Sequence, residues 1–413
     1  MIYIVTLIAI TCCAFVFDFG NVKNPRLKNV CYTLLLIWLI ALSGFAYNVG
    51  ADIPGYMRQY AEIGRHHFKS WEDLSYFDNR QPGWMLLNIL CSSISRRFVL
   101  LQLVIATFCN CVILNFIKKH TKYIFVGLFL YFVCYYLNFN FNSIRQTIAI
   151  SFFLLGYEHL VNKKWVKYYI YCLCAFMFHA SAIICFIFPL FYLIKFKLKW
   201  FLVFIFSLLL VSVFAITRGG ADILSNLLLN NTELMGMFVD NAEQLTELYF
   251  GEDANEYGVL NIFGIISMFM HTTPIVLVLI GAGKKTITLP EIGAPLILFF
   301  MILHLLDFIV PVIFMRFLMY LDIVYICALS DFVIDFPEKY IGRKTYLLRN
   351  MVTVFLLFIA LYRPVTTFFR VNPLRDELPF YRQFYPYHSV FNPKIDPQRA
   401  EYYGSYNDKD TYY

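Results

Sequence analysis

Two polar clusters interrupt long apolar runs between Asn138 and Ala182, and the first suits the binding of phosphate oxygens. It contains Asn142, Arg145 and Gln146, which place amide donors beside a fixed positive charge. An arginine between two membrane-length apolar runs is costly unless it faces a polar cavity or a bilayer surface. Arg145 could simply reach the lipid headgroups. We favour phosphate or pyrophosphate binding, because an ionisable residue within a membrane is a functional candidate by default.

The second cluster is Phe178-His179-Ala180-Ser181-Ala182, within the apolar run Tyr168–Ile194. The side chain of His179 can accept a proton or hydrogen-bond a sugar or phosphate, because histidine titrates near neutral pH. A histidine that hydrogen-bonds a neighbouring helix explains its presence equally well. The residues alone leave both interpretations open.

Charged residues also stand beside two expected helix ends. Asp52 follows an apolar run and lies between Gly50 and Pro54. Its carboxylate can face a site at the membrane surface, or it can merely cap a surface helix. Arg316 is expected in a turn, Pro311–Arg316, between two spans. A second phosphate-binding group and a plain interfacial arginine are both reasonable there.

The composition predicts a membrane protein. The 413 residues are 60% apolar, against about 45–50% in soluble domains. Since about 20 apolar residues cross a bilayer as a helix, the many continuous runs predict an all-α, polytopic transmembrane bundle of about 12 spans. Pro82–Ser95 is too short for a span and is expected to be re-entrant, whereas Tyr168–Ile194 is expected to be two half-helices hinged at His179. Met1–Phe17 lacks a basic leader and is expected to be a retained span.

Basic residues gather in short clusters between the apolar runs. The positive-inside rule places these clusters on the cytoplasmic side: 23–28, 118–122, 163–167, 195–199, 284–285 and 339–344. Asp18–Asn29 is then a cytoplasmic connection, and Arg145, His179 and the Pro311–Arg316 turn fall on the outer side. We expect a transmembrane domain over residues 1–363, with outer loops at 48–81 and 218–257, and an extracytoplasmic Tyr- and Pro-rich tail over residues 364–413.

Several classes of site are not expected. The net charge of +7 lies in these loop clusters, which is a topological signal, so no nucleic-acid partner is expected. None of the eleven cysteines has metal-ligand spacing with histidine. No phosphate-binding glycine loop or serine-nucleophile motif is present. Without metal or cofactor, the chemistry requires a substrate that is already activated, and a lipid-linked sugar pyrophosphate at the outer face fits.

The ordered motifs resemble the EpsG family of Wzy-like polysaccharide polymerases. The matching elements are Gly50-x-Asp52-x-x-x-Tyr56, Gln81-Pro82-Gly83-x-x-Leu86-Leu87, Phe141-Asn142-x-Ile144-Arg145-Gln146-x-x-Ala149, Phe178-His179-x-Ser181-Ala182, Arg316-x-x-x-Tyr320 and Tyr385-Pro386-Tyr387. Two departures concern the first loop. Asn48 and Asp52-Ile53 replace an arginine and an Asp-Tyr pair, and Gln81 replaces a glutamate, which excludes a catalytic carboxylate at position 81.

The resemblance implies a multi-span protein of the bacterial inner membrane, similar to glycosyltransferases that use lipid-linked donors (GT-C-like). It would join repeat units of a capsule, exopolysaccharide or O-antigen at the outer face. Donor and acceptor would be glycans on a polyprenyl pyrophosphate, surrounded by membrane lipids, and a chain-length regulator is a candidate partner. The substrate-binding residues would be Tyr56, Asn142, Gln146, Ser181, Arg316 and Tyr320.

Our hypothesis for the reaction is glycosyl transfer. Arg145 would stabilise the pyrophosphate leaving group, and Asp52 or His179 would take the proton of the acceptor hydroxyl. Asp52 is the first choice because it lies in the outer loop. A flippase or exporter of lipid-linked glycans would use the same arginines, but the two halves of the chain show no convincing repeat. A glycan ligase is a closer alternative.

Overall fold

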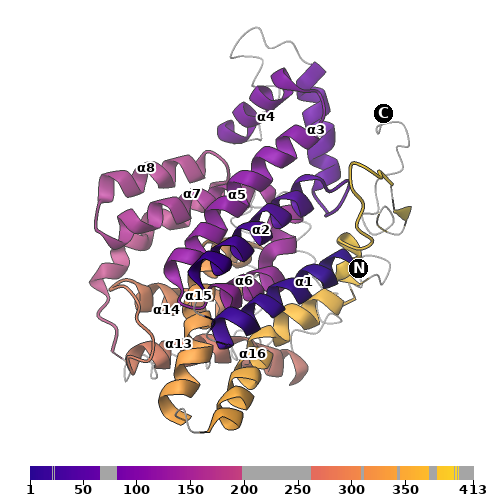
Figure 1. Cartoon of the computed structure of the whole chain (residues 1–413). Coiled ribbons are helices and arrows are strands. Elements are labelled where there is room, and N and C mark those ends of the chain that lie inside the picture. The colour runs from indigo at the N-terminus through magenta and orange to yellow at the C-terminus, as the bar shows by residue number, and fades with distance from the viewer. Residues whose placement is uncertain are drawn as a thin grey trace. The chain divides into compact units, whose positions relative to one another are not determined.

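The computed structural model describes residues 1–20, 22, 24–65, 81–197, 262–307, 311–341, 345–371, 379–394, 396, 397 and 399. Within this part the elements are helices, joined by a few isolated β-bridges (Figure 1). The chain forms two compact units, described separately below. The first unit comprises Met1–Gly156, Leu173–His179 and Pro364–Tyr413, and the second comprises Tyr157–Cys172 and Ala180–Arg363.

The first unit is built mainly from the N-terminal helices. They are α1 (Ile2–Cys13), α2 (Pro25–Gly44), α3 (Ile53–Arg65), α4 (Pro82–Ile94), α5 (Val99–His120), α6 (Ile124–Tyr131) and the part of α7 (Ile144–Val161) that precedes Tyr157. Three π-helical stretches, Ala14–Phe19, Phe132–Tyr136 and Asn138–Asn142, continue α1 and α6. Helix α2 packs along α5, α3 packs on α4, and α1 packs on α6, as Figure 1 shows.

Helix α2 begins earlier than the sequence suggested. Asp18–Asn29 was expected to be a connection, but α2 starts at Pro25. The side chain of Asn24 accepts a hydrogen bond from the Leu27 amide at 3.0 Å and caps the helix. Proline is well placed next, because the first helical position needs no amide donor.

The second unit contains the helices of the C-terminal half. Helix α8 (Trp165–Phe176) lies in it up to Cys172, followed by a 3₁₀ stretch (Ala180–Leu193), α13 (Ile262–Gly283), α14 (Gly293–Asp307), α15 (Pro311–Ile341) and α16 (Tyr346–Phe369) up to Arg363. Helix α14 packs against α13 and α15. The prediction of a turn over Pro311–Arg316 is wrong, because these residues form the start of α15. Proline is common in the first turn of a helix as well as just after a helix ends, so a proline alone does not indicate a turn.

The predicted break at His179 and the predicted shortness of the helix after Gln81 are confirmed, while the re-entrant course of that helix stays a prediction. Helix α8 ends at Phe176 and a separate helical stretch begins at Ala180, so the run Tyr168–Ile194 is broken at His179. Helix α4 has only 13 residues, fewer than the roughly 20 that cross a bilayer. The expected span Trp200–Thr217 and the acidic loop 218–257 lie outside the described residues, as do positions 66–80 of the first loop.

The helical class and the membrane character are supported. Four helices of the described chain are long and apolar enough to span a membrane: Ile2–Phe19, Pro25–Gly44, Val99–His120 and Phe314–Ile341. Shorter apolar helices, among them α4 and α14, accompany them. The figure of about 12 spans stays a prediction from the apolar runs.

Three basic clusters meet at one end of the second unit. Lys163 forms an ion pair with Glu291 at 2.8 Å, beside the loop that carries Lys284 and Lys285. The ammonium group of Lys339 donates to the backbone carbonyls of these two lysines at 3.1 and 3.2 Å. The grouping of these clusters on a single side agrees with the charge pattern, and the side of the membrane stays a prediction.

Candidate functional site

Arg145 lies at the start of α7, directly after the π-helical stretch that ends at Asn142. Its Nε atom donates to the hydroxyl of Tyr56 at 3.2 Å, and its Nη1 atom donates to the amide oxygen of Gln81 at 2.9 Å. The guanidinium carbon also lies 5.7 Å from the centre of the Tyr56 ring. Both acceptors are neutral, and these two bonds orient the half-buried guanidinium.

A buried aromatic pair holds Tyr56 in place. The rings of Tyr56 and Trp84 are 5.0 Å apart at 58°, and Trp84 is fully buried. The Trp84 indole donates to the side chain of Gln59 at 3.0 Å, which ties α4 back to α3. Tyr56 and Trp84 belong to one apolar cluster with Ile144 of α7. The helix pair α3–α4 therefore presents its acceptors to Arg145 from a packed base.

Tyr60, one turn after Tyr56 on α3, donates a structural hydrogen bond. The hydroxyl of Tyr60 donates to the carbonyl of Ser95 at 2.6 Å, across the end of α4. Burial raises the pKa of Tyr60 to about 12. The hydroxyl therefore keeps its proton near neutral pH. It joins α3 to the end of α4 and is not suited to proton transfer.

The Gln81-Pro82-Gly83 motif joins the site to the second polar cluster. The amide of Gly83 donates to the carbonyl of Met177 at 2.8 Å. This pairs an amide of the first turn of α4 with a carbonyl just past α8, two kinds of group that helix ends leave unsatisfied. A Cβ atom at Gly83 would lie 2.8 Å from that carbonyl oxygen, so only glycine permits the approach.

His179 follows this docked segment in the first unit. The ring of the preceding residue, Phe178, stacks on Phe152 at 5.5 Å and 22° and packs against the apolar cluster. The backbone amide of His179 donates to the Ala175 carbonyl at 3.1 Å, and its side chain is half-buried. The structure thus brings the Gln81-Pro82-Gly83 motif and the cluster around His179 together.

Asp52 stands at the start of α3. Its carbonyl accepts the amide of Tyr56 at 3.1 Å, which makes it the N-cap residue by backbone pattern, and it is solvent-exposed. Asp52 therefore lies one helical turn before the tyrosine that bonds Arg145. This position agrees with a helix cap, and a carboxylate that faces a site at the membrane surface stays a prediction.

Asn142 and Gln146 are more enclosed than expected of substrate-binding residues. Asn142 is 9% exposed and Gln146 is 3% exposed. The Oδ1 atom of Asn142 accepts the Ala51 amide at 2.7 Å, and its Nδ2 atom donates to Gln383 at 2.8 Å. Asn142 therefore holds the first loop and the C-terminal segment against the helix that carries Arg145.

The remaining predicted site residues belong to the second unit. The Oγ atom of Ser181 and the hydroxyl of Tyr320 are 3.2 Å apart, and both side chains are buried. Arg316 lies one turn before Tyr320 on α15 and is half-buried. Their role as substrate contacts stays a prediction.

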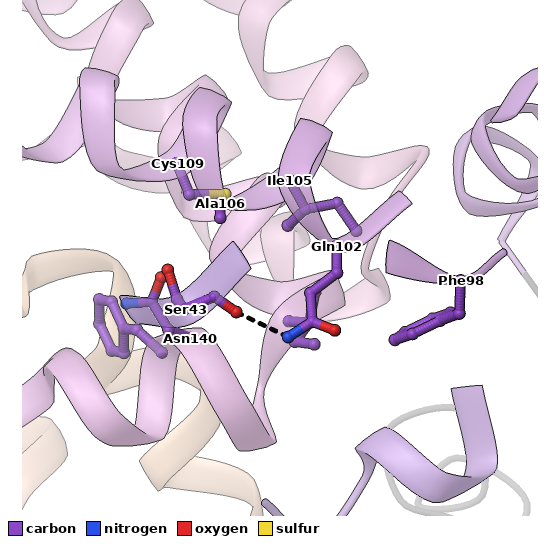
Figure 2. A pocket seen from close by; sticks show the side chains of 9 residues that line it. Ser43, Phe98, Gln102, Ile105, Ala106, Cys109 and Asn140 are labelled. Carbon is purple, nitrogen blue, oxygen red and sulfur yellow. Dashed lines mark hydrogen bonds between the residues drawn. The ribbon is translucent and has the colours of Figure 1, made fainter. Parts of the chain in front are cut away.

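A small pocket with a mostly apolar lining lies in the first unit. It has a volume of about 10 Å³ and is lined by Ser43, Gln102 and Asn140, among others. Figure 2 shows Gln102 donating to the Ser43 carbonyl, at 2.6 Å. A volume of about 10 Å³ has room for roughly one water molecule. It is a structural cavity and is too small for a sugar.

The interpretation of the sequence missed two residues of this region, Gln383 and Arg399. Gln383 stands two positions before the Tyr385-Pro386-Tyr387 element that the motif search had singled out, which was a usable signal. Arg399 lies among charged tail residues and nothing in its local pattern distinguishes it. Its role emerges only from its burial and its bonds to carbonyl oxygens.

Comparison with known families decides the relationship. The model of the EpsG family matches residues 29–389 of the chain. The chain belongs to the EpsG family. No curated protein and no solved structure matches it.

Membership of the EpsG family agrees with the motif order on which the resemblance was based. The matched range includes all the residues predicted for the site and ends before Arg399. The EpsG family is associated with polysaccharide polymerase or glycosyltransferase-like function. Together with the apolar helices, membership indicates a membrane protein of polysaccharide biosynthesis.

Proposed function

We propose that this protein is a polysaccharide polymerase that joins oligosaccharide repeat units carried on polyprenyl pyrophosphate. The observation that carries the proposal is the geometry of Arg145. The hydroxyl of Tyr56 on α3 and the side chain of Gln81, the N-cap residue of α4, orient its guanidinium. A guanidinium presents a planar set of donors that matches phosphate oxygens. The EpsG-family membership supports a glycan substrate.

The proposed reaction is a direct glycosyl transfer. A hydroxyl of the acceptor glycan attacks the anomeric carbon of the donor, and a new glycosidic bond forms. The bond from that carbon to the pyrophosphate oxygen breaks, and the leaving group departs with the electron pair. Arg145 stabilises the negative charge that develops on the leaving group. The hydroxyl proton passes to a base on the protein.

Asp52 is the proposed base, and His179 is the alternative. Asp52 is exposed and one helical turn from Tyr56, so an acceptor glycan in solvent can approach it beside Arg145. His179 follows the segment docked on Gly83. If the base is a carboxylate, turnover should fall as the pH drops through about 4. If the base is a histidine, turnover should fall as the pH drops through about 6.5. The pH profile of turnover therefore distinguishes the two.

Ser181, Tyr320 and Arg316 are proposed as substrate contacts, as the family motifs imply. Arg316 would supply further positive charge for phosphate oxygens. We further propose that the protein resides in the bacterial inner membrane with this chemistry on the extracytoplasmic face. The clustering of Lys163, Lys284 and Lys339 at one end of the second unit supports an orientation with that end in the cytoplasm.

The test uses the purified full-length protein in liposomes with the polyprenyl-pyrophosphate repeat unit. A polymerase converts it to a ladder of longer glycans and releases polyprenyl pyrophosphate. Movement of the substrate between leaflets without new glycosidic bonds would instead identify a flippase and overturn the proposal. Transfer of the glycan to a different acceptor, with no ladder, would identify a ligase and would also overturn it.

A further inference from the structure

The first loop is held between the C-terminal segment and the π-helical stretch before Arg145. The Tyr47 amide donates to the His388 carbonyl, and the Val390 amide donates to the Phe45 carbonyl, both at 2.9 Å. The Gly50 amide donates to the Gln383 carbonyl at 2.9 Å. These bonds join residues more than 300 positions apart to the loop that leads directly into Asp52.

Gln383 connects this loop to the helix that carries Arg145. Its backbone carbonyl accepts from Gly50, and its side-chain oxygen accepts from Asn142 at 2.8 Å. Asn142 in turn accepts the Ala51 amide at 2.7 Å. Gln383 is 5% exposed. The loop, the C-terminal segment and the stretch before Arg145 thus form one closed hydrogen-bond circuit.

Arg399, near the end of the C-terminal segment, bonds both to the first loop and to that segment itself. Its side chain is 1% exposed, and its Nη1 atom donates to the Asn48 carbonyl at 2.5 Å. Its Nη2 and Nε atoms donate to the carbonyls of Pro386 and Arg382. Asn48 has a φ of 50° and Gly50 has a φ of 103°. The loop therefore takes a sparsely populated backbone conformation that its surroundings must maintain.

We propose that Gln383 and Arg399 are positioning residues, which fix the first loop and with it Asp52 beside Arg145. We call residues 379–394, 396, 397 and 399 the C-terminal clamp. The clamp acts on the loop, the loop ends at the N-cap of α3, and the first turn of α3 carries the tyrosine that bonds Arg145. Removing a clamp residue leaves buried amides and carbonyls without partners, so the loop must shift to reach other partners. The consequence for turnover rests on the proposed polymerase function.

The first experiment measures the loop directly and does not depend on activity. A cysteine is placed at position 52 of the full-length protein, and its labelling by a membrane-impermeant maleimide is timed. The unsubstituted protein provides the background of the native cysteines. We expect R399Q and Q383A each to increase the labelling rate several-fold. K394Q removes an exposed positive charge of the same segment and should leave the rate unchanged.

The second experiment measures turnover with the natural Asp52 present. We expect R399Q and Q383A to lower kcat about tenfold or more, while KM for the lipid-linked donor changes little, because Arg145 stays in place. R399K, which keeps a donor, should recover part of kcat. A purely structural role would instead lower the amount of folded protein, and the protein that does fold would keep the wild-type kcat and KM. Q383A exchanges a neutral residue and serves if the Arg399 variants do not accumulate.

Unchanged labelling in both variants, or equal effects of R399Q and K394Q, would overturn the role of the clamp. A kcat that stays at the wild-type level despite faster labelling would overturn its role in turnover. An inactive wild-type protein would overturn the proposed polymerase function. The labelling experiment would still decide whether the clamp fixes the loop.

Discussion

Asp18 and Arg145 are both charged residues in the helical part of the first unit, but their surroundings differ. Asp18 is 6% exposed, and its carboxylate accepts the ammonium of Lys28 at 3.2 Å and the amides of Phe125 and Val126 at 2.7 and 3.0 Å. It caps the start of α6 from another helix. Arg145 is only half-buried and is oriented by a hydroxyl and an amide.

The difference separates a structural charge from one that suits a ligand. The Asp18 carboxylate faces a cation and the positive end of a helix, so the protein itself compensates its charge. The two described bonds of Arg145, to the Tyr56 hydroxyl and the Gln81 side chain, orient a guanidinium that is only half-buried. Substitutions should therefore affect stability at Asp18 and turnover at Arg145.

The largest effect is expected from R145A. Loss of a group that stabilises the developing leaving-group charge lowers turnover by about 10²–10³-fold. The thermal midpoint in detergent should change little, because the side chain is only half-buried. R145K is the matched control, and it should retain part of the activity because it keeps the charge but not the planar set of donors. A wild-type glycan ladder from R145A would show that Arg145 is not needed for turnover and so does not differ from Asp18 in this respect.

The converse variant is D18N. It leaves Lys28 without its ion pair and weakens the cap of α6, so the free energy of unfolding should fall by about 1–3 kcal/mol. Thermal or denaturant unfolding in detergent measures this loss, while KM for the donor should stay at the wild-type value. K28Q, at the more exposed partner, should cost less. A change in KM without loss of stability in D18N would contradict the structural role of Asp18.

G83A sharpens the comparison, because it alters the support of the Arg145 site without touching its charge. The new methyl group would lie 2.8 Å from the Met177 oxygen, so α4 must move at a cost of about 1–3 kcal/mol. Because Gln81 begins this helix, we expect lower turnover together with lower stability, measured in the same assays. G55A is the matched control, since a Cβ at Gly55 meets no atom within 4 Å. Equal behaviour of the two variants would show that the docking on Met177 is unimportant.

The smallest effect is expected from Y56F. It removes one hydrogen bond, in which the charged guanidinium of Arg145 donates to a neutral hydroxyl at 3.2 Å, and such a long bond contributes about 1.5 kcal/mol. The ring packing on Trp84 is retained, so the protein should fold normally and turnover should fall between about twofold and tenfold. Kinetics on the lipid-linked donor would measure this. A loss as large as that of R145A would mean that Tyr56 itself contacts the reacting groups.

Much of the architecture was predictable because it depends on local pattern. Continuous apolar runs predict membrane helices, and the break at His179 follows from a run too long for one straight span that carries a histidine at its middle. The short helix α4 follows from its length. The turn over Pro311–Arg316 was predicted wrongly, because proline marks the first turn of a helix as well as its end. The early start of α2 was missed because Arg26 and Lys28 suggested a loop.

The roles of the candidate site residues stay predictions. Asp52, Tyr56, Arg145 and His179, all named from the sequence, belong to the first unit. Ser181, Arg316 and Tyr320 belong to the second unit. Asn142 was predicted to contact substrate, yet its polar atoms bond Ala51 and Gln383. A short list of polar residues in apolar surroundings does not distinguish a ligand contact from a structural one.

Residue types and their spacing along the chain are sufficient to predict the helical membrane class, the family and the arginine with the strongest case for a functional test. Three features become visible only in the folded chain: the groups that orient Arg145, the cap that Asp18 provides to a distant helix, and the bonds from Gln383 and Arg399 to the first loop and its neighbours. Such bonds join residues far apart in the chain, and each donor or acceptor has many possible partners of the same chemical type. Folding selects among them by packing, which no local pattern records.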